Sequence, residues 1–595
     1  MKKKEKDKKE KLPSYGGQAL LEGVMMRGVS TVAMAVRTSD GDILVDAKRL
    51  KSGKKWYRKI PVVRGVFAFG ESLFTGVKSL TKSAEVSAPE GEKIGKGWMG
   101  FAVFLGLALG VGLFILLPML LNSLVIDNFI PGNILLSSLV EGLLRIVIFV
   151  LYLVVVSLMK DIRRTFQYHG AEHRTINCFE QGLDLTVENV QKCSTRHNRC
   201  GTTFLFFVML VSILVFSLAN WFIAEMGITA DAVGKIPLAL IKLAIRLGFL
   251  PLVAGLSYEL LRGLAALPNN WFTNIFRMPG LALQRLTTYP PENGMAEVAL
   301  TSFLEAYSMD SDPLLPELEF GQFRYVPYRE RVEKKLAGIN ADTAETDWIF
   351  CDVTGYRRAE LREIKILTFE QHKKIKRILE RRLAGEPLWY ILGYCEFYGN
   401  RLIINHNALI PRFETELLCE EAIKEIKARK ETPPHVLDLC TGSGCIALTL
   451  AQNTDAALIA SDFSEPALSV AINNLEGTEV GIVFSDLFDN LKGRTFDVIV
   501  SNPPYIKTDE LDSLEIEVKH YEPIAALDGG KDGLDFYRRI IAAAPMYLNP
   551  NGCILFEVGY DQAADVAKLL EKNFKGIEVK KDLALVDRII KGYLK

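Results

Sequence analysis

Four long apolar runs constrain this chain more than any other feature of its sequence. They cover residues 98–126, 139–159, 203–224 and 236–258. A helix needs about 20 apolar residues to cross the hydrocarbon core of a bilayer, and each run is near or above that length. Buried helices of a water-soluble protein are the alternative, but four such runs in series with almost no acidic residues favour four transmembrane helices.

The distribution of lysine and arginine around these runs predicts the orientation of the chain. Basic residues crowd the first 97 residues, the segment 160–199 and the stretch after residue 262, whereas the two remaining loops carry one lysine between them. Because short cytoplasmic loops of membrane proteins are enriched in lysine and arginine, we expect a multi-pass protein of the cell membrane, embedded in the lipid bilayer. Both termini, and the long segment after the last span, should then lie in the cytoplasm.

A few charged residues lie inside the apolar runs. Such charges are expensive in a bilayer unless they are paired or functional. Glu141 and Arg145 are four residues apart, a spacing that places the two side chains on one face of a helix. We therefore expect them to neutralise each other.

The loop between the second and third runs contains a candidate metal site. His169, Glu172 and His173 form the pattern H-x-x-E-H, which on a helix places both imidazoles on one face, where Zn²⁺ could bind with Glu172 as a base for metal-bound water. His197 and Cys200 follow as further candidate ligands. The alternative is a polar helix at the membrane interface whose histidines bind headgroups or backbone, and the glycine inside the pattern disfavours a helix.

The residues around this pattern resemble a known family. The shared motifs are Tyr15-Gly-Gly-Gln-Ala19, the stretch 22–28, His169-Gly-Ala-Glu-His173 and the stretch 197–202. They make residues 1–305 similar to the YqhQ-type bacterial membrane proteins. That family is described as metal-dependent enzymes of unknown reaction, so the resemblance implies a metal-dependent function without naming a substrate.

After the last apolar run the sequence divides into four segments. Prolines and glycine in 306–328 predict a linker. The charged, lysine-rich pattern of 329–395 predicts a small helical domain, and residues 396–412 predict a β-hairpin. Residues 413–595 then alternate strands and helices, as expected of a doubly wound, Rossmann-like α/β domain of the class I methyltransferase type.

A strand, a glycine-containing loop and a helix lie near the start of this last segment. The strand 436–439 runs into Cys440-Thr-Gly-Ser-Gly444, whose glycines permit a tight turn and let backbone N–H groups approach a ligand. Asp462 ends the next strand, where its carboxylate can accept both hydroxyls of a ribose. Asp486 and Leu487 follow the third strand, where they would flank an adenine.

These features predict a nucleoside cofactor that needs no phosphate cradle. The loop has only two glycines, so the dinucleotide fingerprint of NAD enzymes is incomplete, and no Walker-type lysine accompanies it. S-adenosyl-L-methionine therefore fits better than the NAD of an oxidoreductase. The candidate cofactor-binding residues are Asp438, Cys440, Thr441, Gly442, Ser443, Gly444, Asp462, Asp486, Leu487 and Asn502.

The fourth strand, 496–501, ends in Asn502, Pro503, Pro504 and Tyr505, the candidate catalytic residues. Ligands of an open α/β sheet bind just beyond the carboxyl ends of its strands. There the Asn502 side-chain oxygen and the Pro503 carbonyl can each accept one N–H of a planar NH2 group and aim its nitrogen at a methyl donor, while Tyr505 packs against the flat group. Proline suits this turn because its φ is fixed and it donates no N–H. An ordinary Asn-Pro turn is the alternative for these four residues alone.

Residues 329–595 resemble a second family, and more closely. The motifs include residues 385–393, Asp438-Leu-Cys-Thr-Gly-Ser-Gly444, Asn502-Pro-Pro-Tyr505 and Glu557-Val-Gly559. They are similar to those of PrmC/HemK, the release factor glutamine N5-methyltransferases. The resemblance implies S-adenosyl-L-methionine as cofactor, peptide chain release factors 1 and 2 as partners bound by the helical domain, and the glutamine of their Gly-Gly-Gln motif as substrate.

Three residues depart from the usual pattern of that family. Cys440 stands where glycine is usual, Phe413 where proline is frequent and Trp389 where glutamine is frequent. The first could narrow the cofactor loop, and none lies in the turn expected to hold the substrate.

Two other functions stay open. An N6-adenine DNA methyltransferase is one, because the same turn grips any flat NH2 group. The equal numbers of basic and acidic residues, 71 of each, argue against a DNA partner. The other is a membrane transporter, scaffold or metallohydrolase to which the methyltransferase half is accessory.

The chain also contains a Gly-Gly-Gln tripeptide of its own. Gly16, Gly17 and Gln18 would face the same compartment as the methyltransferase segment. One hypothesis is that Gln18 is a self-substrate or pseudosubstrate. The alternative is that the tripeptide serves only the membrane-domain family whose motif it belongs to.

Overall fold

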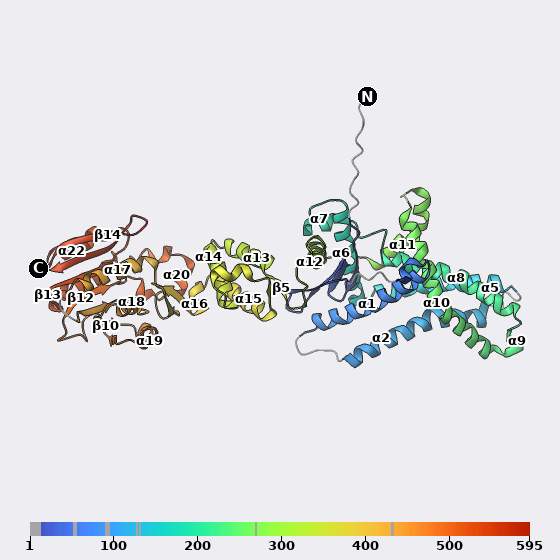
Figure 1. Cartoon of the computed structure of the whole chain (residues 1–595), viewed down its shortest axis with the longest axis horizontal. Helices are drawn as coiled ribbons and strands as arrows, with labels where there is room; N and C mark the ends of the chain where they lie inside the picture. Colours follow the sequence, from blue (N-terminus) through green and yellow to red (C-terminus); the bar gives the residue numbers. More distant parts are fainter. Residues whose placement is uncertain are drawn as a thin grey trace, which may run out of the picture. The chain divides into compact units, whose positions relative to one another are not determined.

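The structure, a computed structural model, describes residues 13–50, 56–89, 96–126, 129, 133–267, 270–429 and 433–595 (Figure 1). The lysine-rich start of the chain, part of the basic first 97 residues, lies outside the described residues. Two compact units form the structure: Met1–Arg324 with Lys365–Phe369, and Tyr325–Ile364 with Glu370–Lys595. The first contains the apolar runs and the second the candidate methyltransferase motifs.

A four-stranded antiparallel sheet opens the first unit, in the order β1-β2-β3-β4. Its strands are β1 (Gly16–Leu20), β2 (Gly23–Arg27), β3 (Thr31–Arg37) and β4 (Ile43–Arg49). Helices α6 (Lys160–Glu180) and α12 (Asn293–Ser311) pack on the sheet, and the core between them includes Val24, Met26, Ala35, Tyr168 and Phe303. The sequence predicted only a helical membrane domain here, because β1 and β2 are short and contain glycine, and β3 is almost continuously apolar, so that no regular alternation marks these strands.

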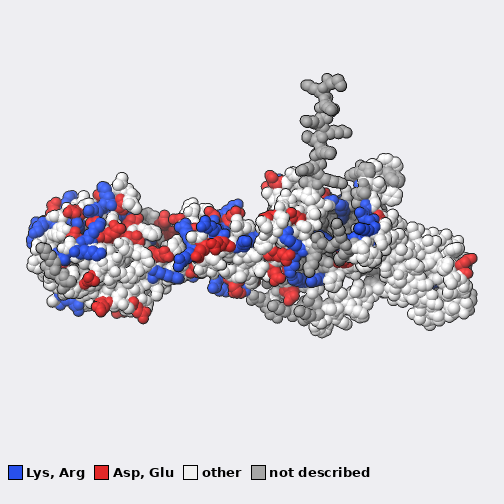
Figure 2. Space-filling view, in the orientation of Figure 1, with Lys and Arg blue, Asp and Glu red and all other residues white. Residues whose placement is uncertain are grey.

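The four apolar runs form the helices that the sequence predicted. They are α2 (Lys96–Val111), continued by η2 (Gly112–Leu116), α3 (Leu117–Leu121) and η3 (Asn122–Ile126), then α5 (Ile134–Ser157), α8 (Gly201–Glu225) and α10 (Lys235–Ala266). Within the described residues, four stretches are long and apolar enough to cross a membrane: Gly100–Leu124, Ile134–Ser157, Gly201–Glu225 and Ile236–Leu264. Figure 2 shows few charged side chains over the end of the first unit formed by α5 and α8, a surface suited to lipid.

A buried charge cluster joins three of these helices. Arg145 Nη2 donates to Glu141 Oε1 at 2.9 Å, which confirms the predicted pair. Arg246 of α10 donates to both oxygens of Glu141, at 2.6 and 2.9 Å, and Arg145 also donates to Ser212 of α8. Because a charge left unpaired in hydrocarbon is costly, this network favours one arrangement of α5, α8 and α10.

Shorter elements complete the first unit. They are η1 (Trp56–Lys59), α1 (Val63–Ser87), α7 (Val187–Lys192), α9 (Ala230–Val233), α11 (Trp271–Thr287) and the paired strands β5 (Phe323–Arg324) and β6 (Ile366–Leu367). In Figure 1, α11 runs across the direction of α8 and α10. Because α12 extends to Ser311, the predicted linker 306–328 begins inside a helix.

Short helices and a hairpin open the second unit. The helices are α13 (Tyr325–Ala337), α14 (Thr343–Thr354), η4 (Arg358–Glu363), α15 (Phe369–Leu383) and α16 (Leu388–Leu392). The hairpin pairs β7 (Tyr394–Phe397) with β8 (Asn400–Ile403), earlier than the 396–412 that the sequence predicted. Tyr398 and Gly399 make the turn with φ of 50° and 75°, the left-handed pair that two-residue hairpin turns require.

A seven-stranded sheet forms the rest of the second unit, in the order β11-β10-β9-β12-β13-β15-β14. Its strands are β9 (His435–Leu439), β10 (Ala457–Asp462), β11 (Gly481–Phe484), β12 (Phe496–Ser501), β13 (Leu548–Glu557), β14 (Phe574–Lys581) and β15 (Asp587–Leu594). The first five in that order are parallel, and β15 is antiparallel to both neighbours. This confirms the predicted doubly wound α/β fold.

Helices connect these strands. They are α17 (Phe413–Lys427), α18 (Cys445–Asn453), α19 (Glu465–Asn474), α20 (Ile516–Tyr521), α21 (Asp535–Ala543) and α22 (Ala563–Glu571), with the 3-10 turns η5 (Leu511–Ser513), η6 (Ile524–Ala526) and η7 (Ala544–Met546). From β9 the chain fills one side of the sheet through β10 and β11, then crosses to β12 on the other side. The carboxyl ends of β9 and β12 therefore border the crevice where such sheets bind ligands.

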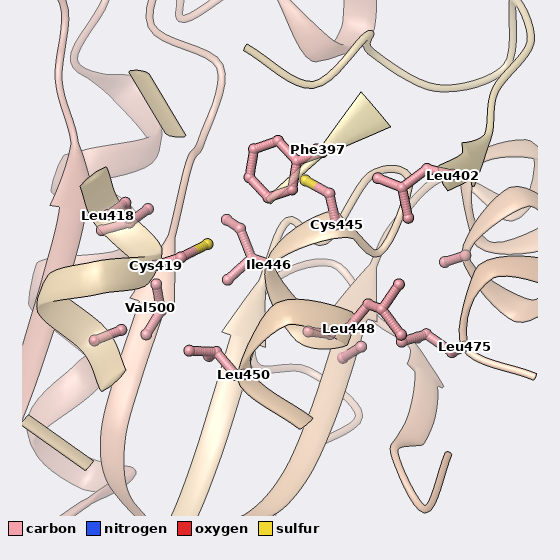
Figure 3. Close-up of a cluster of buried hydrophobic side chains, with 14 of the residues drawn as sticks. Phe397, Leu402, Leu418, Cys419, Cys445, Ile446, Leu448, Leu450, Leu475 and Val500 are labelled. Atoms are coloured by element: carbon pink, nitrogen blue, oxygen red, sulfur yellow. The ribbon is translucent and has the colours of Figure 1, made fainter. Parts of the chain in front are cut away.

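Successive residues of the central strands enter different cores. Val500 packs with Leu418, Ile446 and Leu450 on one face of the sheet (Figure 3). Val436 belongs to the same cluster. Their neighbours Leu437 and Ile499 pack on the other face, with Tyr537 and Phe556 among others. Burial on both faces explains why these strands are continuously apolar in sequence.

Candidate functional site

The loop after β9 holds a tight turn at the edge of the crevice. Cys440 has a φ of 63° and Gly444 a φ of 81°, both in the left-handed region. A Cβ at position 444 would lie 3.2 Å from the Cβ of Ala471. Glycine at 444 therefore allows α18 to start close against α19.

Asp438, the second-last residue of β9, stabilises this loop through its side chain. Its Oδ2 accepts hydrogen bonds from Thr441 Oγ1 at 2.5 Å and from Ala447 N at 3.1 Å. Its Oδ1 is buried and has no hydrogen-bond partner among the described residues. Burial raises the pKa of Asp438 to about 7.

Asp462 ends β10 and reaches the same loop. Its Oδ2 accepts a hydrogen bond from Gly442 N at 2.9 Å, and its Oδ1 accepts one from Ser464 N at 3.0 Å. Burial raises the pKa of this carboxyl. Because a carboxylate oxygen can accept more than one hydrogen bond, Asp462 still has capacity for a ligand.

A cavity opens between the loop, Asp462 and the turn after β12. It contains about 770 Å³ of empty space, its open mouth included, a size in the usual range for small-molecule sites. Of the predicted site residues, those that line it are Cys440, Thr441, Gly442, Ser443, Asp462, Asn502 and Pro504. The fold thus gathers the loop, the acid and the turn at one place.

The other predicted site residues are not among those that line this cavity. They are Asp438, Gly444, Asp486, Leu487, Pro503 and Tyr505. Asp486 is exposed and accepts a hydrogen bond from Arg539 Nη2 at 2.7 Å. A role beside an adenine stays a prediction for Asp486 and Leu487.

Asn502 is held by Thr415, which is held in turn by Glu557, and neither residue was among the site residues predicted from the sequence. Its Nδ2 donates to Thr415 Oγ1 at 3.3 Å, and Thr415 Oγ1 donates to Glu557 Oε2 at 2.7 Å. Glu557 is 1% exposed, and burial raises its pKa. Because Nδ2 is engaged on the protein side, the chain Glu557–Thr415–Asn502 leaves the Asn502 Oδ1 as an acceptor for a ligand.

Tyr505 is anchored by its hydroxyl and its backbone. The hydroxyl donates to Glu557 Oε1 at 3.4 Å, and the carbonyl accepts from Gln562 Nε2 at 2.8 Å. A Cβ at Gly529 would lie 2.7 Å from Tyr505 Cα, so glycine there allows the backbone after η6 to pack on the turn. Stacking of Tyr505 on a substrate stays a prediction.

No local signal pointed to Thr415 or Glu557 as partners of Asn502. The contacts join residues 87 and 142 positions apart, and only the fold brings them together. Arg412 is a further lining residue that was missed, and it donates to both oxygens of the buried Glu522, at 2.7 and 2.9 Å.

In the first unit, three of the four candidate metal ligands converge. The ligand atoms of His169, His173 and Cys200 all lie within 4.8 Å of one another, and Cys200 Sγ is 3.3 Å from His169 Nε2. Each imidazole donates its Nδ1–H to a backbone carbonyl, His169 to Thr287 at 2.9 Å and His173 to Thr195 at 2.6 Å. Such bonds fix the tautomer that presents Nε2 to a metal.

The fourth candidate ligand is engaged elsewhere. His197 Nε2 donates to Glu180 Oε2 at 3.3 Å, and His197 is outside the group of converging ligand atoms. Glu172, the expected base, is buried 3.9 Å from His169 Nε2, with no hydrogen-bond partner for its Oε2 among the described residues. Burial raises the pKa of Glu172.

The glycine inside the H-x-x-E-H pattern has a packing role. A Cβ at Gly170 would overlap the carbonyl oxygen of Tyr289. Only glycine fits at this position, and α6 is continuous through the motif despite the low helix propensity of glycine.

Gln18 lies in β1, where it is paired with Met25 and half-buried. Its side chain packs at Gly76 of α1, and it lines a cavity of about 1110 Å³ with His169, Glu172 and others. Whether it is also methylated stays a prediction.

Comparisons with known proteins match different parts of the chain. Residues 60–309 match a family described as a protein of unknown function (DUF1385). Residues 330–393 match the PrmC N-terminal domain, and residues 415–517 match the methyltransferase small domain. Both resemblances expected from the sequence are confirmed.

Several curated relatives of the carboxyl-terminal part of the chain are named release factor glutamine methyltransferase. That of Thermodesulfovibrio yellowstonii is 42% identical over 267 residues, which are 44% of this chain and 96% of the relative. That of Geobacter sulfurreducens is 40% identical over 264 residues, 43% of this chain and 90% of the relative. That of Clostridium acetobutylicum is 42% identical over 220 residues, 36% of this chain and 76% of the relative.

Proposed function

The carboxyl-terminal part of this chain belongs to the release factor glutamine methyltransferase family, and we propose that it methylates the glutamine side-chain amide (N5) in the Gly-Gly-Gln motif of peptide chain release factors. The proposed methyl donor is S-adenosyl-L-methionine. Residues 329–395 are proposed to bind the release factor. The observation that carries the proposal is the orientation of Asn502, whose Nδ2 is held by Thr415 while its Oδ1 stays available.

The residues present fit the proposed donor. The cavity is large enough for a nucleoside. Asp462, at the end of β10, offers a carboxylate for the ribose hydroxyls, and the loop from Thr441 to Gly444 offers backbone close to the ligand. When bound, S-adenosyl-L-methionine supplies an electrophilic methyl group.

The protein's contribution to the reaction is positioning. An amide nitrogen is a poor nucleophile because its lone pair is delocalised, and no side chain deprotonates it usefully near neutral pH. In the proposal, Asn502 Oδ1 and the Pro503 carbonyl each accept one N–H of the substrate amide. These oxygens orient the nitrogen and stabilise the positive charge that develops on it, and the nitrogen then releases its proton to water.

The test is transfer of labelled methyl by the purified full chain in detergent. We expect label on release factor, and none on release factor whose motif glutamine is replaced by alanine. Duplex DNA in the same reaction tests the N6-adenine alternative. Label on DNA in preference to release factor, or on the glutamine-free release factor, would overturn the proposal.

The four apolar helices support a membrane location, and the proposed topology places both termini in the cytoplasm. The support is the excess of lysine and arginine in 160–199 and after residue 262. Reporter fusions after Ser311 and within the loop 227–234 test it. The fusion after Ser311 should report a cytoplasmic location, and the fusion within 227–234 should report the opposite side of the membrane. The reverse result would overturn the proposed topology.

The convergence of His169, His173 and Cys200 favours a second function, zinc binding in the first unit. Two imidazoles and one thiolate suit zinc, which when bound supplies a Lewis acid. Glu172, buried beside them, is proposed as the base of a hydrolytic site. Metal analysis of the purified chain should show zinc in the wild type and in His197→Ala, and its loss from His173→Ala and Cys200→Ser; zinc retained by both of the latter would overturn the site.

A further inference from the structure

A second large cavity of the first unit lies where two spanning helices leave the apolar region. It contains about 1230 Å³ of empty space, its open mouth included. The residues just before α8, the last turns of α10 and the first turns of α11 line it. Gly201 starts one candidate span and Leu264 ends another, so the cavity lies at the boundary of the membrane-crossing stretches.

The lining of this cavity is strongly basic. Four arginines and one glutamate line it: Arg196, Arg199, Arg262, Arg277 and Glu180. The glutamate is already engaged, since it pairs with Arg199 and accepts a hydrogen bond from His197. The cavity therefore keeps an excess of positive charge that its own residues do not neutralise.

Arg196 and Arg262 are the least engaged of these arginines, and the one acidic neighbour that acts on Arg262, Glu259, is itself ion-paired with Arg64. Arg196 and Arg262 are both exposed, and within the part of the chain that the structure describes neither guanidinium has a hydrogen-bond acceptor or an ion-pair partner. Arg277 differs, because it is 8% exposed and donates to the carbonyls of Leu264 and Leu267 at 2.9 and 3.1 Å. Arg277 thus stabilises the C-terminal end of α10 by binding its carbonyls. The guanidinium groups of Arg196 and Arg262 remain available to bind an anion.

Exposed apolar side chains lie next to the basic lining along the chain, at Leu267 and on α11, the helix that carries Arg277. Leu267 lines the cavity and is 50% exposed, and Trp271, Ile275 and Met278 are 76%, 51% and 63% exposed on α11. The spacing of the last three places them on one face of that helix. Since α11 runs across the direction of α8 and α10 (Figure 1), this face is arranged as in a helix that lies in a membrane interface.

We propose that this cavity binds the phosphate of an anionic membrane lipid, with Arg196 and Arg262 on the headgroup and the acyl chains along the apolar residues of α10 and α11. Guanidinium groups bind phosphate oxygens through paired, charge-assisted hydrogen bonds. Basic cavities between the polar ends of transmembrane helices suit lipid headgroups. Free phosphate shares the charge but lacks the chains, so the exposed apolar surface favours the lipid.

The test measures lipid binding to the purified full chain in a non-ionic detergent. The probes are phosphatidylglycerol, the zwitterionic phosphatidylcholine, glycerol phosphate and inorganic phosphate. We expect phosphatidylglycerol to bind more tightly than the other three. The double variant Arg196→Gln/Arg262→Gln should raise its Kd by about tenfold or more.

A matched variant controls for general attraction to positive charge. Lys160→Gln/Arg285→Gln removes the same charge from two exposed positions outside the cavity lining, and should leave the Kd within about twofold. An equal loss of affinity for phosphatidylglycerol in both double variants, or no loss in Arg196→Gln/Arg262→Gln, would overturn the proposal. Inorganic phosphate binding as tightly as phosphatidylglycerol would overturn the lipid assignment.

A second measurement uses only the wild type, so its result does not depend on whether a variant folds. If the headgroup is held by exposed arginines, raising NaCl from about 50 to about 500 mM should weaken phosphatidylglycerol binding severalfold, because salt screens such charges. Binding of phosphatidylglycerol that does not change with salt would contradict a site built on Arg196 and Arg262.

Discussion

The Thr415 hydroxyl donates a 2.7 Å hydrogen bond to Glu557, a residue 142 positions further along the chain. Thr415 belongs to α17, which precedes the sheet, and Glu557 ends β13 near its centre. The bond ties the entry of the domain to the turn after β12, because the same hydroxyl accepts from Asn502 Nδ2 at 3.3 Å. The orientation of the proposed substrate-binding amide therefore depends on a residue outside the turn.

Replacing Thr415 tests this positioning role. Thr415→Val keeps the shape but removes the bond to Glu557, which should cost about 1–3 kcal/mol of stability because a buried carboxyl loses its donor. The kcat on release factor should fall roughly tenfold or more, since Asn502 loses its orientation. Thr415→Ser should restore most of the activity. A purely structural role predicts lower stability with kcat unchanged in the folded fraction, so kcat, KM and thermal unfolding are measured together.

Replacing Asn502 should lower kcat more than replacing Thr415 does. Asn502→Ala removes the proposed acceptor for the substrate N–H, and loss of one such group lowers kcat by about 10²–10³-fold in comparable sites. The Kd for S-adenosyl-L-methionine, measured by calorimetry, should rise less than it does in Asp462→Ala, because Asp462 and the loop after β9 remain. Methyl transfer at the wild-type rate by Asn502→Ala would contradict the proposed role.

Asp462→Ala should affect the Kd for S-adenosyl-L-methionine more than kcat, the reverse of Asn502→Ala. Removing the carboxylate that faces the cavity should raise the Kd for S-adenosyl-L-methionine by roughly tenfold or more, because hydrogen bonds to a charged group contribute about 1.5–3 kcal/mol. At saturating donor, kcat should fall less than in Asn502→Ala. A Kd equal to that of the wild type would show that the ribose is held elsewhere.

The buried carboxyl of Asp438 predicts a pH-dependent stability. Burial raises its pKa from 3.8 to about 7, so the folded state binds a proton that the unfolded state has lost between these values. Its contribution to stability is therefore complete below pH about 4, declines as the pH rises to about 7 and is constant above that. Asp438→Asn cannot ionise, so the difference in unfolding temperature between wild type and variant should shift across this window in favour of the variant as pH rises. A difference independent of pH would contradict the assignment.

Gly170→Ala tests the close packing of α6, the helix that carries the proposed metal ligands His169 and His173. The new methyl group would meet the Tyr289 carbonyl, so we expect a loss of about 1–3 kcal/mol from overpacking and a lower zinc content. Gly248→Ala is a matched control in α10, because a Cβ there meets nothing within 4 Å. It should be neutral or slightly stabilising, as alanine favours helix more than glycine does. Equal stability of the two variants would remove the proposed reason for Gly170.

Patterns confined to a short stretch of sequence determined much of this protein. The four apolar runs predicted their helices, because length and hydropathy are properties of a segment alone. The order of the loop at 440–444, Asp462 and the turn at 502–505 predicted a parallel sheet with its ligands at one edge, because the carboxyl ends of parallel strands meet there. The spacing of Glu141 and Arg145 likewise predicted their pair.

Only the tertiary structure decided features that depend on residues distant in the chain. Arg246 joins the Glu141 pair from another helix, and His197 bonds to Glu180 and lies outside the group of candidate metal ligands. The sheet β1–β4 forms from strands whose sequences show no regular alternation of polar and apolar residues. Thr415 and Glu557 became partners of Asn502 in the same way. The physical reason is common to all of them: a periodic pattern reports which face of a segment is apolar, whereas the partner of a polar side chain is set by packing between segments, which no local pattern encodes.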